Sequence, residues 1–420
     1  MGRRQRTRSG ASAASVSNKP ARGISIMKIV SSKPHVRLVT GLLGALFALG
    51  CGNTDPARPD SPSPDAIEHA DPSGEPDASA SSADANKAKT TDDFSAKTTE
   101  TKTTSRVVGY LQTFHSLEPS TIDLDALTHL ILAFAGPKPT QAGLTIDFEN
   151  GNPNITKLIA AAHLKNVKVL GAIGGGTSGG LVTDALKLDS DAVVGAALTF
   201  LHGYELDGID IDIENEAIDP ETYEKLVTGL VAGLPAGKLL TAAVGNYKRE
   251  NYRALDKLSF LSVMSYDRCG ALGNERCPHS PYSQAERDLE FWSTEYWQQA
   301  GVVYDKANIV LGVPFYGHCW GEGCLAIKPV DESPALAEVT NSPSYSEVLA
   351  FWNKDTGRNG EPVPDFLEDD AHTYYLTLNG PQTIERKALL AKNYGGVMIW
   401  ELGHDAPGAS SLLSLIQKIR

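Results

Sequence analysis

The sequence from Arg106 onward predicts a (β/α)8 TIM barrel, because short β-rich runs and helical patterns alternate along it. Eight apolar runs each have the length of a strand, and a helical pattern follows most of them. Eight strand–helix units in about 315 residues match the size of such a barrel. The expected strands are 107–112, 128–135, 167–172, 208–213, 239–244, 260–265, 309–314 and 396–400.

Helical stretches separate these runs, and one longer segment interrupts the alternation. Residues 315–372 follow the seventh strand and predict a modest insertion on the upper face of the barrel. A doubly wound open sheet is the competing fold, since residues 174–179 fit GxGxxG. That motif is weak by itself, and no acidic partner is evident after a second strand. The expected helices are 155–166, 192–202, 220–234, 283–300 and 383–392.

The first 50 residues predict an export signal rather than a part of the fold. They contain nine Lys or Arg and no Asp or Glu, and a mostly apolar run at 38–50 ends at Cys51. A basic flank before a short apolar core is typical of a secretory signal, and the run is too short for a comfortable membrane span. The segment resembles a bacterial lipoprotein signal, which implies lipid attachment at Cys51. Ordinary signal cleavage is the alternative, and Met27 is an alternative start.

Residues 51–104 predict a disordered acidic tether, and residues 105–420 predict one large domain. Ser, Thr, Ala, Pro and Asp dominate the tether, which cannot bury enough apolar area to offset its ordering entropy. Without residues 1–50 the chain carries 29 basic and 51 acidic residues, a net charge of −22. This charge argues against a nucleic-acid partner and favours a neutral or cationic one. We expect an exported monomer that meets a membrane through its lipid anchor.

Four further cysteines form two close pairs, Cys269 with Cys277 and Cys319 with Cys324. Exported chains oxidise, so both pairs fit small disulfide loops, although three pairings are open. A zinc site is less favoured because neither spacing is CxxC. The sequence implies no metal and no organic cofactor.

The fourth expected strand carries the strongest chemical signal. In DGIDIDIE at 207–214, three isoleucines share one face, while Asp210, Asp212 and Glu214 share the face that points into the barrel. Carboxylates stacked inward repel one another and resist desolvation, which raises the pKa of at least one of them. Glu214 is nearest the C-terminal end of the strand, where barrel active sites open, and is the expected general acid. A solvated charge run would not alternate with isoleucines, and a calcium loop would need Gly in place of Asn215.

This run resembles the DGxDxDxE signature of glycoside hydrolase family 18, which holds chitinases and endo-β-N-acetylglucosaminidases. The similarity extends from about residue 106 to residue 420. Five more segments are similar to strands of that family, in the same order. They are VGYL at 108–111, LTHLILAFA at 127–135, MSYD at 264–267, LGVPFYG at 311–317 and GGVMIWE at 395–401.

The resemblance implies a substrate-assisted mechanism without an enzyme nucleophile. Glu214 would protonate the glycosidic oxygen while the N-acetyl carbonyl of the substrate attacks the anomeric carbon, and would later act as a base. Asp212 would orient the acetamido group, Asp210 would share charge and a proton with Asp212, and Tyr266 would hydrogen-bond the acetamido group. The residues implied in substrate binding are Trp400, Asp267, Met264, Tyr110 and Phe134.

Some of these residues have a second interpretation, and the sequence departs from the family pattern nearby. Core packing is the alternative for Trp400 and for Tyr266, and a structural hydrogen-bonding role is the alternative for Asp267. The third strand ends in AIGG where the family usually has SxGG, so we expect Tyr110 to hold Asp210 alone. Gly176 stands where many chitinases have Trp, which predicts a weaker grip on a long crystalline chain.

Two tryptophans in or near the insertion, Trp320 and Trp352, could supply sugar platforms or fill the core of the insertion. The leading functional prediction is a chitinase-type hydrolase of β-1,4-linked N-acetylglucosamine, acting on a polysaccharide or an oligosaccharide. An endo-β-N-acetylglucosaminidase acting on N-glycan chitobiose cores is the alternative. A peptidoglycan hydrolase is less favoured because the acidic ladder is intact, and a sugar-binding lectin is less favoured because Glu214 is present.

Overall fold

The computed structural model describes residues 105–141, 143–214, 218–245, 249–268, 276–328, 340–355 and 357–420. The expected signal at 1–50, the expected tether with Cys51, and Cys269 lie outside the described residues, so these interpretations stay predictions. Within the ranges given above, none of the helices combines the length and the apolar character that crossing a bilayer requires.

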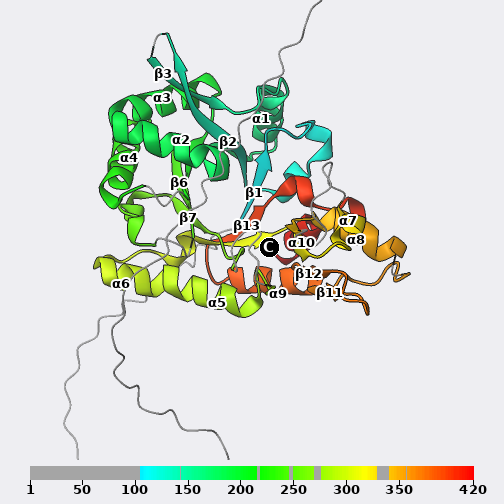
Figure 1. The fold of residues 1–420 in the computed structure, drawn as a ribbon. Helices are drawn as coiled ribbons and strands as arrows, with labels where there is room; N and C mark the ends of the chain where they lie inside the picture. Colours follow the sequence, from blue (N-terminus) through cyan, green and yellow to red (C-terminus); the bar gives the residue numbers. More distant parts are fainter. Residues whose placement is uncertain are drawn as a thin grey trace, which may run out of the picture. The chain divides into compact units, whose positions relative to one another are not determined.

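Eight parallel strands close into a barrel, which confirms the predicted fold (Figure 1). Around the ring they follow the order β1, β2, β4, β5, β6, β7, β8 and β13, and the pairing of β13 with β1 closes it. A closed ring excludes the open doubly wound sheet. The bounds are β1 Arg106–Gln112, β2 His129–Thr140, β4 Lys168–Gly174, β5 Gly208–Asp212, β6 Leu239–Val244, β7 Phe260–Val263, β8 Ile309–Pro314 and β13 Gly396–Trp400.

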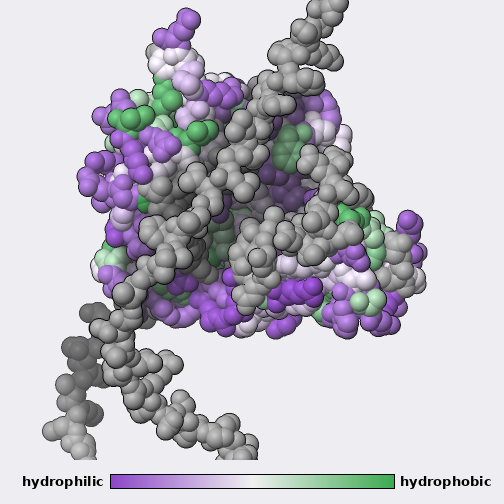
Figure 2. All heavy atoms as spheres, in the orientation of Figure 1, coloured by the Kyte–Doolittle hydropathy of each residue, from purple (hydrophilic) through white to green (hydrophobic). Residues whose placement is uncertain are grey.

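Helices lie between the strands and include all five predicted ones. The predicted helix at 283–300 is divided, because a wider π-helical turn at Phe291–Glu295 separates α5 from α6. Hydrophilic side chains cover the exposed side of α5 in Figure 2, whereas Ala285 and Leu289 are buried. The bounds are α1 Ile155–Leu164, α2 Gly175–Leu188, α3 Ser190–Gly203, α4 Pro220–Gly233, α5 Tyr282–Glu290, α6 Tyr296–Ala300, α9 Pro381–Ala391 and α10 Leu412–Ile419.

A hairpin that the sequence did not predict extends one wall of the barrel. Strand β2 continues past residue 135 and pairs antiparallel with β3, Gly143–Phe148 (Figure 1). Pro137 and Pro139 argue against a strand here, because proline cannot donate a ladder hydrogen bond. The pairing of β2 with β4 ends at Ala135. Beyond Ala135 the strand pairs with β3, so Pro137 and Pro139 remove no hydrogen bond to β4.

The insertion after β8 forms a small antiparallel sheet in the order β10, β9, β12, β11. A disulfide between Cys319 and Cys324 joins β9 to α7, as the local pairing predicts. Trp320 is 4% exposed and Trp352 is 2% exposed, so of the two alternatives for these residues the burial favours the core of the insertion over sugar platforms. The bounds are β9 His318–Trp320, α7 Cys324–Ile327, β10 Thr340–Asn341, α8 Tyr345–Asp355, β11 Phe366–Glu368 and β12 Tyr375–Thr377.

The barrel has an inner and an outer apolar core, and β5 presents a different kind of residue to each. Ile209 and Ile211 pack in the outer core, between the strands and the surrounding helices. Asp210 and Asp212 therefore face the interior, as the period-two pattern predicts. The inner core is made by Val108, Tyr110, Ile131, Ala133, Leu170, Ala172, Phe260, Val310 and Met398.

Candidate active site

The acidic ladder rises along β5 from a fully enclosed position to an open one. Asp210 is 0% exposed and Asp212 is 3% exposed, whereas Glu214 lies just past the end of the strand, where its side chain opens to the cavity while protein surrounds the rest of it. Asp212 and Glu214 line a cavity of about 490 Å³ at the C-terminal ends of the strands. The general acid expected from the sequence is thus the member of the ladder that a bound substrate can reach.

Asp210 is held by two hydroxyl groups from neighbouring parts of the barrel. Tyr110 Oη donates to its Oδ2 at 2.7 Å, and Thr241 Oγ1 donates to its Oδ1 at 2.5 Å. Thr241 reaches it because β5 and β6 pair in a register that sets these two residues side by side. The expectation that Tyr110 holds Asp210 unaided is therefore wrong. Burial raises the pKa of Asp210 to about 6, and the two hydrogen bonds oppose that rise.

Asp212 and Glu214 interact directly, and the hydrogen bond between their carboxyl groups raises the pKa of Asp212 and lowers that of Glu214. Burial raises the pKa of Asp212 well above its usual range, and the charges of Glu214 and Asp210 raise it further. Burial also raises the pKa of Glu214, with a contribution from Asp267, while the hydrogen bond with Asp212 opposes the rise. Because the second oxygen of Asp212, Oδ1, has no partner within the described part of the chain, this carboxyl can accept a new donor.

Asp267 lies beside the ladder and is kept ionised by three polar neighbours. Tyr316 Oη donates to Oδ1 at 2.7 Å, His318 Nε2 lies 2.8 Å from the same oxygen, and His279 Nδ1 lies 3.5 Å from it. Burial by itself raises the pKa of Asp267, but the interactions with these neighbours outweigh it and hold that pKa well below its ordinary value. Sequence reasoning gave none of the three a role, because Tyr316 and His318 follow β8 and His279 precedes α5, all far from Asp267 or separated from it by intervening residues in the chain.

The nitrogens of His279 and His318 and the carboxylate of Asp267 lie within 4.8 Å of one another, a separation at which they could hold a metal ion. The two imidazole rings, however, stack with centroids 4.5 Å apart and 19° between their planes. Both rings already direct a nitrogen at Asp267 Oδ1, at 2.8 Å from His318 and 3.5 Å from His279. The arrangement therefore fits a hydrogen-bonded network around Asp267 better than a metal centre.

Aromatic rings form one wall of the cavity. Phe134 and Trp400 stack with centroids 5.5 Å apart and 26° between planes, and Tyr110 packs against Trp400 at 5.5 Å. Gly175 has φ +76°, and a Cβ there would lie 2.4 Å from the Phe134 ring. The glycines that resemble a nucleotide-binding motif thus allow close packing of this wall.

Most of the residues predicted from the sequence meet in one place. Tyr110 and Asp210 lie behind the cavity and are fully buried. Sequence reasoning missed Phe114, which lines the cavity, is 60% exposed and packs on His115, and it also missed Glu149. The predicted residues that line the cavity are Asp212, Glu214, Phe134, Met264, Tyr266, Asp267 and Trp400.

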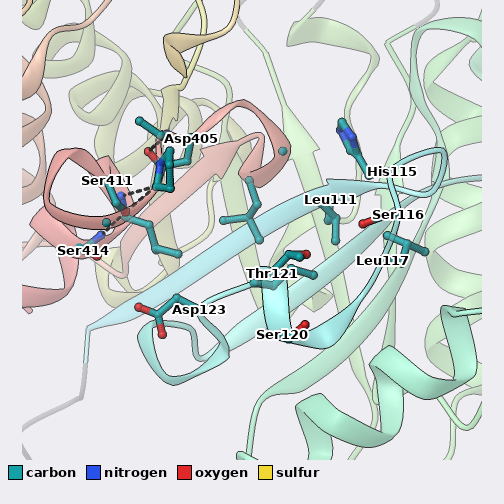
Figure 3. Close-up of a pocket in the computed structure, with 17 residues that line it drawn as sticks. Leu111, His115, Ser116, Leu117, Ser120, Thr121, Asp123, Asp405, Ser411 and Ser414 are labelled. Atoms are coloured by element: carbon teal, nitrogen blue, oxygen red, sulfur yellow. Dashed lines mark hydrogen bonds between the residues drawn. The ribbon is translucent and has the colours of Figure 1, made fainter. Parts of the chain in front are cut away.

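A second cavity of about 570 Å³ lies between the segment after β1 and the C-terminal segment (Figure 3). Leu111, which lines it, belongs to the outer core, so this cavity is on the outer side of β1. Its half-buried acid, Asp405, accepts hydrogen bonds from Ser411 Oγ and from the backbone N–H groups of Ala406, Leu412 and Leu413. The carboxylate therefore secures the start of α10 and leaves little capacity for a ligand.

A closed (β/α)8 barrel whose strand ends bring a graded set of carboxyl groups to an aromatic-walled cavity defines the class of (β/α)8 glycoside hydrolases. Residues 106–405 match Glycosyl hydrolases family 18, and the chain belongs to this family. It is a chitinase-like enzyme.

Named relatives agree with this assignment. The chain is 26% identical over 330 residues to class V chitinase CHIT5a of Medicago truncatula, which covers 68% of this chain and 83% of that protein. It is also 26% identical over 330 residues to chitotriosidase-1 of Mus musculus, covering 68% and 69%. The structure of a chitinase from Bacteroides thetaiotaomicron is 26% identical, with a TM-score of 0.59, and covers 75% of this chain and 96% of that one. The GH18 chitinase ChiB of Flavobacterium johnsoniae is 26% identical, with a TM-score of 0.57, and covers 75% and 93%.

Proposed function

We propose that this enzyme hydrolyses β-1,4-linked N-acetylglucosamine chains of the chitin type, with retention of configuration and with the acetamido group of the substrate as the nucleophile. The observation that carries the proposal is the graded acidic ladder, in which Asp210 and Asp212 are buried and Glu214, beside Asp212, opens to the cavity. The relatives named as chitinases support the choice of substrate class.

In the first step Glu214, whose pKa is raised by burial and by Asp267, gives its proton to the glycosidic oxygen. The bond from this oxygen to the anomeric carbon breaks, and the acetamido carbonyl oxygen forms a new bond to that carbon. The product is an oxazolinium ion, and the leaving sugar departs with the proton. Before this transfer Asp212 passes its proton to Glu214, which leaves Glu214 protonated and Asp212 ionised. Asp212 then turns to the acetamido N–H, accepts its hydrogen bond and stabilises the positive charge, while Asp210 shares the negative charge of the ladder.

In the second step water attacks the anomeric carbon, Glu214 accepts the proton, and the acetamido group is restored. Two inversions at one carbon give net retention. The stacked rings of Trp400 and Phe134 offer an apolar face to the C–H groups of the reacting sugar. Tyr266 lines the same cavity, where its hydroxyl can hydrogen-bond the acetamido oxygen.

The test is an activity panel of chitin oligomers, a high-mannose glycoprotein and peptidoglycan, read by mass spectrometry. We expect cleavage of the chitin oligomers, and release of N-glycans instead would favour an endo-β-N-acetylglucosaminidase. Glu214→Gln should abolish hydrolysis yet still bind oligomers, and Asp212→Asn should be severely impaired. Turnover that is unchanged in Glu214→Gln would refute the mechanism.

We further propose that the enzyme is exported as a lipoprotein attached through Cys51 and separated from the membrane by residues 51–104. The apolar run ending at Cys51 supports this proposal. Cys51→Ser in the full-length chain should remove the lipid and move the protein from the membrane fraction to the soluble one. Unchanged membrane association in that variant would contradict the anchor.

A further inference from the structure

A fourth carboxylate, Glu149, lines the catalytic cavity and has no part in the proposed mechanism. It follows directly after β3, in the hairpin that the sequence did not predict. Its backbone N–H donates to the carbonyl of Phe134 at 3.0 Å, which ties it to the aromatic wall. Ser178, from α2, donates its hydroxyl hydrogen to Oε1 of Glu149. The side chain is exposed, so it faces solvent or a bound ligand from a fixed position.

Within the described residues, Glu149 forms no ion pair with a Lys, Arg or His side chain. The nearest lysine of the hairpin, Lys138, pairs with Asp147 at 3.4 Å and donates to the carbonyl of Phe148 at 2.7 Å. The described residues that line the cavity include Glu149, Asp212, Glu214 and Asp267, and none of them is Lys, Arg or His. A fully acetylated chitin chain is neutral and makes no ion pair with Glu149.

A glucosamine unit, in contrast, carries an ammonium group in place of the acetamido group. Substrate assistance requires the acetyl group on the reacting sugar only, because the acetamido carbonyl of that sugar is the nucleophile. A neighbouring sugar on the Glu149 side of the cavity can lose its acetyl group without loss of the reaction. Its ammonium can then donate to the Glu149 oxygen that Ser178 leaves unoccupied.

We propose that Glu149 is a specificity-determining residue that binds the ammonium of a glucosamine unit, so that partially N-deacetylated chitin is preferred over fully acetylated chitin. This inference rests on the proposed function, since it assumes an acetylated sugar against Trp400. Phe114, the exposed aromatic residue of the same cavity, offers a ring face for a further sugar. A glucosamine at the reacting position itself would bind unproductively, because it has no acetyl carbonyl to attack.

The test uses N-acetylglucosamine pentamers that each carry one glucosamine at a defined position, together with the fully acetylated pentamer. The ratio of kcat/KM for each isomer to that for the fully acetylated pentamer is measured in the unmodified enzyme and in Glu149→Gln, which keeps an acceptor for Ser178. For one isomer we expect a ratio above 1 that falls about fivefold in Glu149→Gln and further in Glu149→Lys. Glu224→Gln, an exposed residue of α4 outside the cavity lining, is the matched control and should keep the original ratio.

Rising salt should reduce the same ratio, because an ion pair open to solvent is screened. Equal ratios in the unmodified enzyme and in Glu149→Gln, or a ratio below 1 for every isomer, would overturn the assignment of Glu149. If the unmodified enzyme cleaves the fully acetylated pentamer but shows no such preference, this inference fails and the proposed function stands. If it cleaves no pentamer at all, the proposed function itself fails.

Discussion

Tyr110 Oη donates a hydrogen bond to Asp210 Oδ2 at 2.7 Å, and this contact links β1 to β5 through the interior of the barrel. Both residues are almost completely excluded from solvent. Burial raises the pKa of Asp210 to about 6, so its ionised form depends on the hydroxyl groups that stabilise it. The base of the acidic ladder is thus set by a residue about 100 positions earlier in the chain.

Tyr110→Phe removes this donor while it keeps the ring that packs against Trp400. Without the hydrogen bond the pKa of Asp210 should rise further, and a protonated Asp210 would lose the negative charge that raises the pKa of Asp212. We expect kcat to fall about tenfold, the usual cost of one hydrogen bond to a charged group. Steady-state kinetics with a chitin oligomer measure the change.

Thr241→Val provides the companion variant, because it removes the other donor to the same carboxylate. The two variants should not be additive, since both act on Asp210. Tyr110→Phe with an unchanged kcat, or with a changed KM and nothing else, would show that the hydroxyl does not tune the ladder.

Asp267→Asn should move the alkaline limb of the pH profile. The charge of Asp267 raises the pKa of Glu214, second to burial. Glu214 must be protonated to act as the acid, so activity is lost as the pH rises through its pKa. Removing the negative charge lowers that pKa, and the alkaline limb of kcat/KM should shift to lower pH. A limb that stays in place or moves to higher pH would contradict the coupling.

The sequence predicted those parts of the site whose geometry follows from residues close together in the chain. The period-two pattern of 207–214 predicts both the inward face and the exposed position of Glu214, because a strand fixes which side chains share a face. It could not predict that Thr241 contacts Asp210 or that His318 contacts Asp267. Those contacts depend on strand register and on the path of the insertion, which are set by packing between distant segments.

The same reason explains the missed hairpin. Local proline chemistry argues against a strand beyond residue 135, but the position of β2 next to β3 removes the cost. Glu149 follows this hairpin, so its place in the cavity could not be foreseen either. Trp320 and Trp352 show a second limit, because the sequence does not distinguish a tryptophan that binds a sugar from one that is buried in a core.

The Cys319–Cys324 disulfide should stabilise the insertion by a modest amount. It closes a loop with a sequence separation of 5, and so short a loop gives only about 2 kcal/mol from the loss of entropy in the unfolded chain. The variant Cys319→Ala/Cys324→Ala should lower the free energy of unfolding by about that amount, with little change in kcat. Urea unfolding measures it, and a complete loss of folding would mean that the bond acts on more than the unfolded chain.

Lys387 of α9 is fully buried and should make stability depend on pH. Its Nζ donates to the carbonyl oxygen of Ser280 at 2.8 Å, to the hydroxyl of Ser280 at 2.7 Å and to Asn379 Oδ1 at 2.7 Å. Burial lowers the pKa of Lys387 to about 7. Between about pH 7 and the ordinary lysine pKa of about 10.4, the unfolded chain therefore binds more protons than the folded one.

Between about pH 7 and 10.4 the contribution of Lys387 to the free energy of unfolding increases with pH. Below about pH 7 this contribution is at its lowest value. Lys387→Met removes the titrating group, so the stability advantage of the unmodified protein over this variant should grow as the pH is raised from neutral. Urea unfolding of both proteins at a series of pH values measures the difference. Lys392→Met, at an exposed lysine next to the end of α9, reports the general effect of losing one charge. A stability advantage that shrinks as the pH rises would show that the folded protein holds the Lys387 proton more tightly than the unfolded chain does.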